Sequence, residues 1–158
     1  MRINSLQSGQ STRIRSLQLK LFLNDLTNLM VIMLLFLLTS CSEINTTNTK
    51  EIYKYWAGKN PPSDIKLLQG HYWESGHWSG EYIMYLKFKS TDKWWNTFIK
   101  KNHLLIDKTN WIMPTDAPSW FKPSANLDRY NNDDDFDQGS RYFRDPLTQV
   151  CYVYEIQL

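Results

Sequence analysis

Hydrophobic and polar positions alternate most clearly over residues 81–89, which read EYIMYLKFK. Successive side chains of a strand point to opposite faces of a sheet, so this alternation predicts a β-strand with one apolar face. The residues predicted on that face are Tyr82, Met84, Leu86 and Phe88. Residues 65–73 before it read as a second strand, and residues 74–80 hold two glycines and two serines, which favour a turn. The two strands therefore predict a hairpin.

A second hairpin is predicted at the end of the chain. Residues 149–157 read as a strand whose two faces carry Val150, Tyr152, Tyr154 and Ile156 on one side and Cys151, Val153 and Glu155 on the other. Residues 141–144 form a short strand candidate before them. The residues between them begin with Asp145 and Pro146, which suit the first two positions of a type I turn.

Helical spacing appears between the two hairpins. In residues 92–102 the apolar side chains recur four positions apart, as Trp94 with Phe98 and as Trp95 with Ile99. Ser90 or Thr91 can cap the N-terminus of this helix, and Asp92 then lies favourably in its first turn.

The rest of the chain predicts little regular structure. Residues 51–56 are compatible with a helix or a strand, and residues 104–106 with a short strand. Three prolines in residues 111–123 predict a loop, and the polar residues 131–139 predict an exposed one. The predicted fold class is α+β, with a small antiparallel sheet built from two hairpins and one helix packed on a face.

The N-terminal segment has the composition of a secretion signal. Residues 29–38 are ten consecutive apolar residues, too few for a membrane-spanning helix and enough for the core of a signal peptide. Four basic residues precede them, at Arg2, Arg13, Arg15 and Lys20.

A short motif follows the apolar segment directly. Leu38-Thr39-Ser40-Cys41 resembles the lipobox of bacterial lipoproteins, in which small residues precede a cysteine that receives a lipid. The resemblance implies lipid attachment at Cys41, and two or more acyl chains would hold the protein stably on a membrane. The predicted organisation is a signal peptide over 1–40, a flexible polar tether over 41–50 and a single globular domain over 51–158.

Charge and cysteine content narrow the classes of function. The 158 residues include 18 Lys and Arg against 16 Asp and Glu. Four of these basic residues and one acidic residue precede Cys41, which leaves 14 against 15 in the rest of the chain. This balance excludes the basic surface of a nucleic-acid-binding protein. With Cys41 lipidated, Cys151 has no disulfide partner, and its apolar neighbours predict an inert buried thiol.

Aromatic residues are abundant, with seven Trp, nine Tyr and seven Phe. One explanation is a large aromatic core, and the other is an exposed patch that stacks against sugars or anchors a protein partner. Trp78 and Trp120 lie in predicted loops and, with Trp73, are the candidates for such a patch.

Two clusters could ligate a metal. Asp133, Asp135 and Asp137 alternate as calcium ligands do, but Gln138 separates them from Gly139 where an EF-hand loop has its glycine directly. We therefore expect a solvated loop there, with these three aspartates as weak calcium candidates.

His71, Glu74 and His77 have the chemistry of zinc ligands, with His103 as a possible fourth. Their spacing is not the helical H-E-x-x-H arrangement, and a G-x-S-x-G motif is absent from the sequence. The sequence therefore predicts no catalytic residue, no resident metal and no cofactor.

Several longer runs resemble small lipoproteins of Bacteroidetes-type bacteria: residues 71–78 (HYWESGHW), 94–100, 118–123 and 154–158. The resemblance implies a lipid-anchored envelope protein, at the outer membrane, and supplies no catalytic residue. We expect a non-enzymatic binding role toward an envelope protein or a glycan. Two alternatives stay open: an immunity or inhibitor lipoprotein directed against a toxin, and a small envelope hydrolase with a cleft at His71, His77 or the acidic cluster.

Overall fold

The protein divides into two compact units, residues 1–41 and 42–158. The computed structural model describes residues 27–31, 42–132 and 137–158. Residues 27–31 of the first unit are helical, and no helix among the described residues is long and apolar enough to cross a membrane. Cys41 and most of the predicted signal peptide lie outside the described residues.

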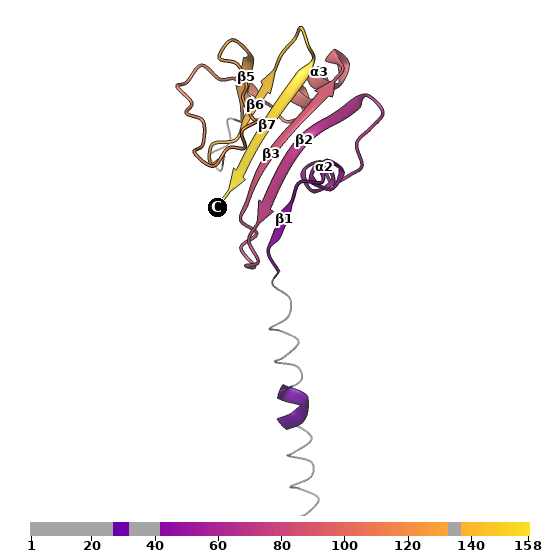
Figure 1. The fold of residues 1–158 in the computed structure, drawn as a ribbon, viewed down its shortest axis with the longest axis vertical. Coiled ribbons are helices and arrows are strands. Elements are labelled where there is room, and N and C mark those ends of the chain that lie inside the picture. Colours follow the sequence, from indigo (N-terminus) through magenta and orange to yellow (C-terminus); the bar gives the residue numbers. More distant parts are fainter. Residues whose placement is uncertain (1–26, 32–41, 133–136) are drawn as a thin grey trace, which may run out of the picture. The chain divides into compact units, whose positions relative to one another are not determined.

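The second unit is built on one antiparallel sheet of seven strands in the order β1-β2-β3-β7-β6-β5-β4 (Figure 1). The strands are β1 (Ile44–Thr46), β2 (Ile65–Glu74), β3 (Tyr82–Ser90), β4 (Leu105–Ile106), β5 (Asp128–Asn131), β6 (Arg141–Arg144) and β7 (Val150–Gln157).

The α+β class and both predicted hairpins, β2–β3 and β6–β7, are confirmed, but the sheet is larger than two hairpins. Pairing of β3 with β7 joins the hairpins into one sheet. The added strands β1, β4 and β5 are two to four residues long. Strand β4 lies in the short strand candidate 104–106, whereas β1 and β5 complete too few periods of alternation to be recognised from the sequence.

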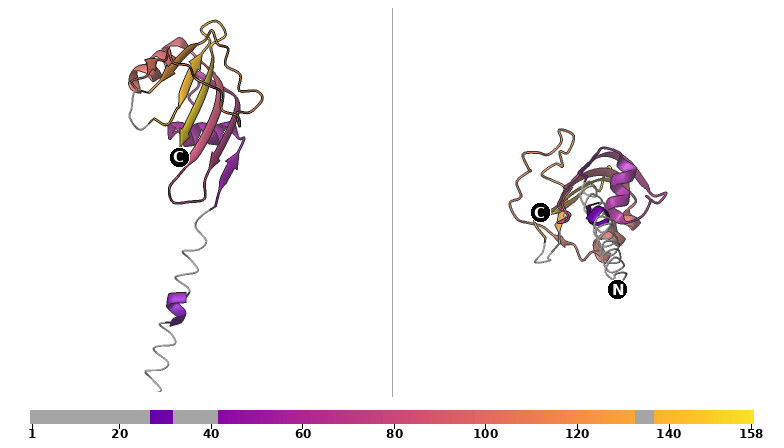
Figure 2. Two further views of the ribbon diagram at one scale, coloured as in Figure 1. Left: turned by 90° about the vertical axis from the view of Figure 1, so that its left-hand side faces the viewer. Right: turned by 90° about the horizontal axis from the view of Figure 1, so that it is seen from below.

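Two helices cover one face of the sheet, whereas one was predicted (Figure 2). Helix α3 (Asp92–Lys101) is the predicted one, and the Thr91 side chain caps it by accepting a hydrogen bond from the Trp94 N–H. Helix α2 (Thr49–Ala57) contains the ambiguous residues 51–56, and the Asn48 side chain caps it by accepting from the Lys50 N–H.

The prediction of a flexible tether over residues 41–50 is wrong for most of that segment. Residues 44–46 form β1, which pairs with β2, and α2 begins at Thr49. Polar side chains alone do not distinguish a tether from this arrangement, because an edge strand and the first turn of a helix both expose most of their surface.

Both faces of the central strands are buried. Met84, Leu86 and Phe88 of β3 lie under the helices and are fully buried, as their alternation predicted. Tyr85 of β3 points to the opposite face, where it packs with Phe121, Phe143 and Tyr154. Residues 107–127, a long irregular segment, cover that second face and bury it with Trp111, Trp120 and their neighbours.

A buried carboxylate fastens this irregular segment to the sheet. Asp107 pairs with Arg129 of β5 at 2.8 Å and with Arg141 of β6 at 2.7 Å. Its other oxygen accepts hydrogen bonds from the backbone N–H and the hydroxyl of Thr109. Although burial opposes ionisation, these hydrogen bonds and the two arginines together hold the pKa of Asp107 below its ordinary value.

Close approach of α2 to the sheet depends on Gly70 in the middle of β2. A Cβ atom at this position would lie 2.7 Å from Cδ1 of Ile52 on α2 and 3.3 Å from Cδ1 of Leu86 on β3. Because glycine has no side chain here, fully buried Ile52 packs directly onto the backbone of β2.

Replacing Gly70 with valine is expected to lower the free energy of unfolding by about 1–3 kcal/mol, since the added methyl groups overpack the site beneath Ile52. Urea denaturation followed by tryptophan fluorescence measures this change. The control is Gln69→Val at the neighbouring exposed position, which adds the same side chain outside the core. Equal stability of the Gly70→Val and Gln69→Val variants would contradict the packing argument.

Candidate functional site

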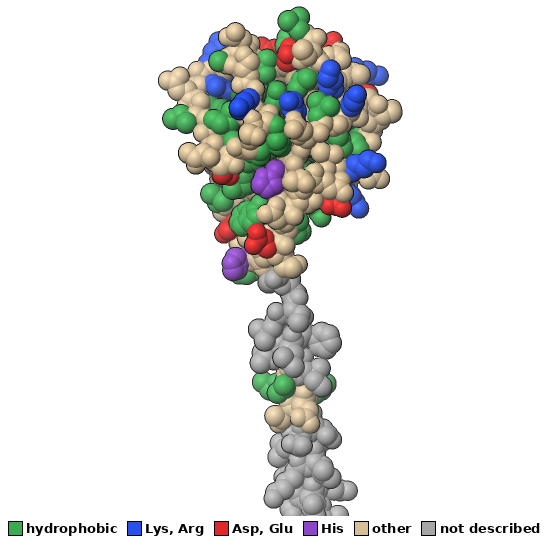
Figure 3. All heavy atoms as spheres, in the orientation of Figure 1, with side chains coloured by type: hydrophobic (Ala, Val, Ile, Leu, Met, Phe, Trp, Pro, Cys, Tyr) green, Lys and Arg blue, Asp and Glu red, His purple; other side chains and the backbone are tan. Residues whose placement is uncertain are grey.

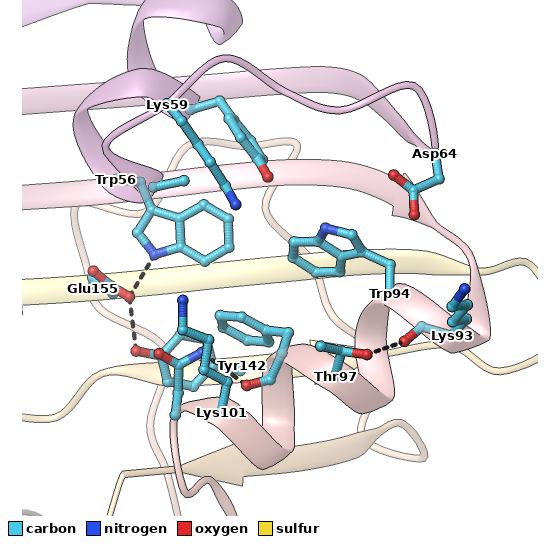
Figure 4. A pocket seen from close by; sticks show the side chains of 13 residues that line it. Trp56, Lys59, Asp64, Lys93, Trp94, Thr97, Lys101, Tyr142 and Glu155 are labelled. Atoms are coloured by element: carbon cyan, nitrogen blue, oxygen red, sulfur yellow. Dashed lines mark hydrogen bonds between the residues drawn. The ribbon is translucent and has the colours of Figure 1, made fainter.

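A cleft of about 620 Å³ opens between α2 and α3 on the helix-covered face (Figure 4). Its size falls in the range of pockets that hold small organic ligands. Aromatic, acidic and basic side chains from both helices, from the segment between α2 and β2, and from β6 and β7 line it: Tyr53, Trp56, Lys59, Asp64, Lys93, Trp94, Phe98, Lys101, Tyr142 and Glu155, together with Ala57, Thr97 and Asn102.

Three aromatic rings form the walls of the cleft. Trp56 projects from the last turn of α2, and Trp94 and Phe98 lie one turn apart on α3. The Trp94 and Phe98 rings stack with centroids 5.3 Å apart, and the Trp56 centroid lies 5.4 Å from that of Phe98 and 6.4 Å from that of Trp94. All three side chains are half-buried, so they retain faces that a ligand can cover.

Glu155 of β7 lies at the base of the cleft. Its Oε1 accepts hydrogen bonds from Trp56 Nε1 and from the Tyr142 hydroxyl, both at 2.7 Å, and its Oε2 accepts one from the Tyr82 hydroxyl at 3.3 Å. Burial raises the pKa of this carboxyl above its ordinary value, although the three donors act in the opposite direction. The hydrogen bond from Trp56 Nε1 to this carboxylate sets the orientation of the indole.

One polar atom in the cleft has no partner. The Tyr53 hydroxyl is buried and makes no hydrogen bond with any described residue. A buried hydroxyl without a partner costs roughly 1–3 kcal/mol. Tyr53 lines the cleft from its inner side and is fully buried, so a ligand would reach this hydroxyl only by displacing the side chains around it.

The opening of the cleft carries a positive balance. Lys59, Lys93 and Lys101 line it, against the single carboxylate of Asp64, and all four residues are exposed. Figure 4 shows these side chains around Trp56 and Trp94. A ligand with a negative group would therefore be attracted to this opening.

The predicted tryptophan patch is not assembled in one place. Trp78 is 97% exposed in the turn between β2 and β3. Trp120 is half-buried and packs edge-on against Phe121 in the second core. Trp73 donates from its indole Nε1 to Glu43 Oε1 at 2.6 Å. It also lines a smaller pocket, of about 300 Å³, on the face of the sheet that carries Tyr85, opposite the helices.

No group of three His, Cys, Asp or Glu side chains among the described residues has the arrangement of a metal site. His71 bonds to Asn45 at 3.2 Å and lines the smaller pocket with Asp116 and Tyr85, whereas His77 and His103 are exposed. Glu74 accepts a hydrogen bond from the Tyr72 hydroxyl instead.

The weak calcium candidates are only partly described. Asp133 and Asp135 lie outside the described residues. Asp137 accepts hydrogen bonds from the backbone N–H groups of Gly139 and Ser140 and pairs with Arg141 at 3.5 Å. Its carboxylate thus stabilises the start of β6.

Cys151 is completely buried, as its apolar neighbours predicted. Burial raises the pKa of its thiol to about 11, so the thiol stays protonated at neutral pH and lacks the reactivity of a nucleophile.

The cleft contains residues that the sequence pattern does not single out. Trp56, Trp94 and Phe98 resembled ordinary core residues, because helical spacing alone cannot distinguish a residue in the wall of a cleft from a residue in the core. Glu155 did carry a signal: it is a carboxylate on the same predicted strand face as Cys151 and Val153. A charged residue at a core-facing position is a recognisable sign of a functional or paired group.

The chain matches no protein-family model, no curated protein and no solved structure.

Replacing Glu155 with glutamine tests its buried ionisation. Because the folded protein holds this proton to a higher pH than the unfolded chain does, ionisation of Glu155 lowers stability as pH rises above its ordinary pKa of 4.5. The free energy of unfolding of the wild type minus that of Glu155→Gln should therefore fall between about pH 4.5 and the raised pKa. Denaturation at a series of pH values measures it, and a difference that rises over this interval would contradict the assignment.

Proposed function

We propose that the protein is a lipid-anchored envelope protein whose cleft between α2 and α3 binds a negatively charged saccharide without converting it. The observation that carries the proposal is the cleft itself, which combines three half-buried aromatic rings with an unpartnered Tyr53 hydroxyl and a lysine-bearing opening.

The anchor is argued from the sequence. A basic segment, ten apolar residues and Leu38-Thr39-Ser40-Cys41 follow one another in the order that lipoprotein signals have. The second compact unit begins at Ser42, directly after the proposed attachment site at Cys41, which is consistent with a domain that starts at the lipid. We propose the outer membrane as its location.

The chemistry of the cleft supports a saccharide as the ligand. Indole and phenyl faces stack on the apolar C–H face of a sugar ring, while its hydroxyls require polar partners close by. Trp56, Trp94 and Phe98 offer the faces, and the Tyr53 hydroxyl offers a donor that no described residue uses. Lys59, Lys93 and Lys101 favour a saccharide with carboxylate or sulfate groups.

Binding without conversion is favoured over hydrolysis by the state of the reactive groups. The Glu155 carboxylate already accepts three hydrogen bonds from Trp56, Tyr142 and Tyr82. It therefore positions an aromatic wall and has little remaining capacity to transfer a proton to a substrate.

Ligand binding is expected to depend on Trp94. Titration calorimetry with a tetramer of galacturonic acid should detect binding, and Trp94→Ala should weaken it about tenfold or more, a loss of about 1.4 kcal/mol. Tyr53→Phe, which removes only the unpartnered hydroxyl, should weaken binding several-fold.

Trp78→Ala is the matched control, because this tryptophan lies outside the cleft and should leave binding unchanged. A neutral tetrasaccharide such as maltotetraose should bind more weakly than the acidic one. Failure of both saccharides to bind, with a protein captured on the Trp94 surface instead, would favour the immunity or inhibitor alternative.

Lipidation is expected to require Cys41. When cells are fed a labelled fatty acid, the wild type should carry the label and Cys41→Ala should not. The control is Cys151→Ser, which removes the other thiol and should keep the label, because Cys151 is buried inside the domain. Label that persists on Cys41→Ala would show that the anchor assignment is wrong.

A further inference from the structure

The turn between β2 and β3 presents a tryptophan to solvent. Trp78 is 97% exposed, so it has almost no contact with its own domain. A hydrogen bond of 2.8 Å from the Ser75 N–H to the Glu81 carbonyl closes the base of the turn, and a second one, from Gly80 to His77, shapes its tip. The turn is thus ordered by its backbone while its largest apolar side chain stays uncovered.

The start of the domain lies beside this turn. Antiparallel pairing places Ile44 of β1 opposite Glu74 and Thr46 opposite Tyr72, so β1 runs away from the turn and the residues before it emerge next to the turn. Figure 1 shows the beginning of β1 and the β2–β3 turn at the same end of the sheet. The hydrogen bond between Trp73 and Glu43 holds this first segment on β2.

Only Ser42 and Glu43 separate Cys41 from Ile44. Three extended residues span at most about 11 Å, so a lipid on Cys41 would enter the membrane close to the end of the sheet that carries Trp78.

We propose that Trp78 is a membrane contact, which inserts its indole into the headgroup region of the leaflet that holds the Cys41 lipid. The inference rests on the proposed lipid anchor. Indole rings favour this region because their body is apolar and their N–H still reaches water or headgroups.

A lipid surface fits Trp78 better than a protein or a sugar does. Protein hot spots and saccharide sites surround an aromatic ring with further walls. Trp78 projects alone from the turn, and the indoles of Trp73 and Trp120 are engaged elsewhere, by Glu43 and Phe121. A membrane needs no preformed wall, since the lipid itself surrounds the ring.

The charges at this end indicate an uncharged lipid surface. Glu43 and Glu81 flank the turn, and on the face seen in Figure 3 the Lys and Arg side chains lie mostly over the opposite, upper part of the domain. Acidic side chains would be repelled by anionic headgroups, so zwitterionic phospholipid is the proposed partner of the turn.

Quenching by lipid in vesicles tests the contact. The full chain is purified from the cell envelope and placed in phosphatidylcholine vesicles whose acyl chains carry bromine, which quenches indoles at the bilayer. Part of the tryptophan emission of the wild type should be quenched, and this part should disappear in Trp78→Ser. Phosphatidylglycerol vesicles with the same brominated chains should quench it less.

The matched control moves the exposed indole to the other end of the sheet. Leu147, which is 93% exposed, lies in the turn between β6 and β7. The β3–β7 register places that turn beside the end of β3, whereas Trp78 precedes the start of β3, at the other end of the sheet. The double variant Trp78→Ser, Leu147→Trp should show no quenching. Equal quenching of the wild type and Trp78→Ser would overturn the proposal.

Flotation with the vesicles separates this inference from the anchor on which it rests. Protein that fails to float refutes the lipid anchor. Cys41 is then coupled through its thiol to a maleimide-bearing lipid in the same vesicles, and quenching is measured again. Loss of the Trp78-dependent quenching in that tethered protein overturns the Trp78 contact on its own account.

Discussion

Two short helices must cover one face of a wide sheet, and this mismatch shapes the domain. Seven strands about 4.8 Å apart span about 29 Å, whereas two helices side by side, each about 10 Å thick, span about 20 Å. Aromatic side chains on α2 and α3 extend the coverage, yet an open cleft remains between the helices. The candidate binding site is thus the uncovered part of the sheet face, and its walls are the same side chains that close the core.

Buried charge then determines how each helix meets the sheet. Arg144 of β6 is almost fully buried, donates to Ser90 at 2.9 Å, pairs with Asp92 in the first turn of α3 and lies over the Trp95 ring. Glu155 holds α2 in a similar way, by accepting a hydrogen bond from the Trp56 indole. Because an unpaired charge in this position would be costly, these contacts restrict the helices to one placement. The cleft is therefore held by ionic and hydrogen-bonded contacts as well as by packing.

The two faces of the sheet are covered by different elements. The helix face contains the cleft with its positive opening, while residues 107–127, held by Asp107, cover the other face, where the smaller pocket lies at Trp73. The end of the sheet where β1 begins carries the β2–β3 turn, which presents Trp78. This division of surfaces is compatible with the proposed attachment at one end and the proposed binding on one side.

Local patterns by themselves determined the elements whose signal repeats. Strand β3, helix α3 and the β6–β7 hairpin were each predicted because alternation or four-residue spacing recurs within them. The turn at Asp145 was predicted because Asp and Pro suit the first two positions of a type I turn. In the structure the Asp145 carboxylate accepts hydrogen bonds from the N–H groups of Leu147 and Thr148. The proposed lipobox is likewise read from a contiguous segment of the sequence. Strands β1 and β5 were missed because their hydrogen-bond partners, and not their own composition, make them strands.

Only the tertiary structure decided which aromatic residues form a site. Trp78 and Trp120 were proposed together because both lie in loops, yet one is exposed at a turn and the other packs in the second core. Trp56 and Glu155 are 99 residues apart and meet through the β3–β7 pairing and the packing of α2 on the sheet. Sequence determines what each side chain can do locally, whereas a cleft depends on distances between segments that are distant along the chain, and those distances exist only once the sheet is assembled.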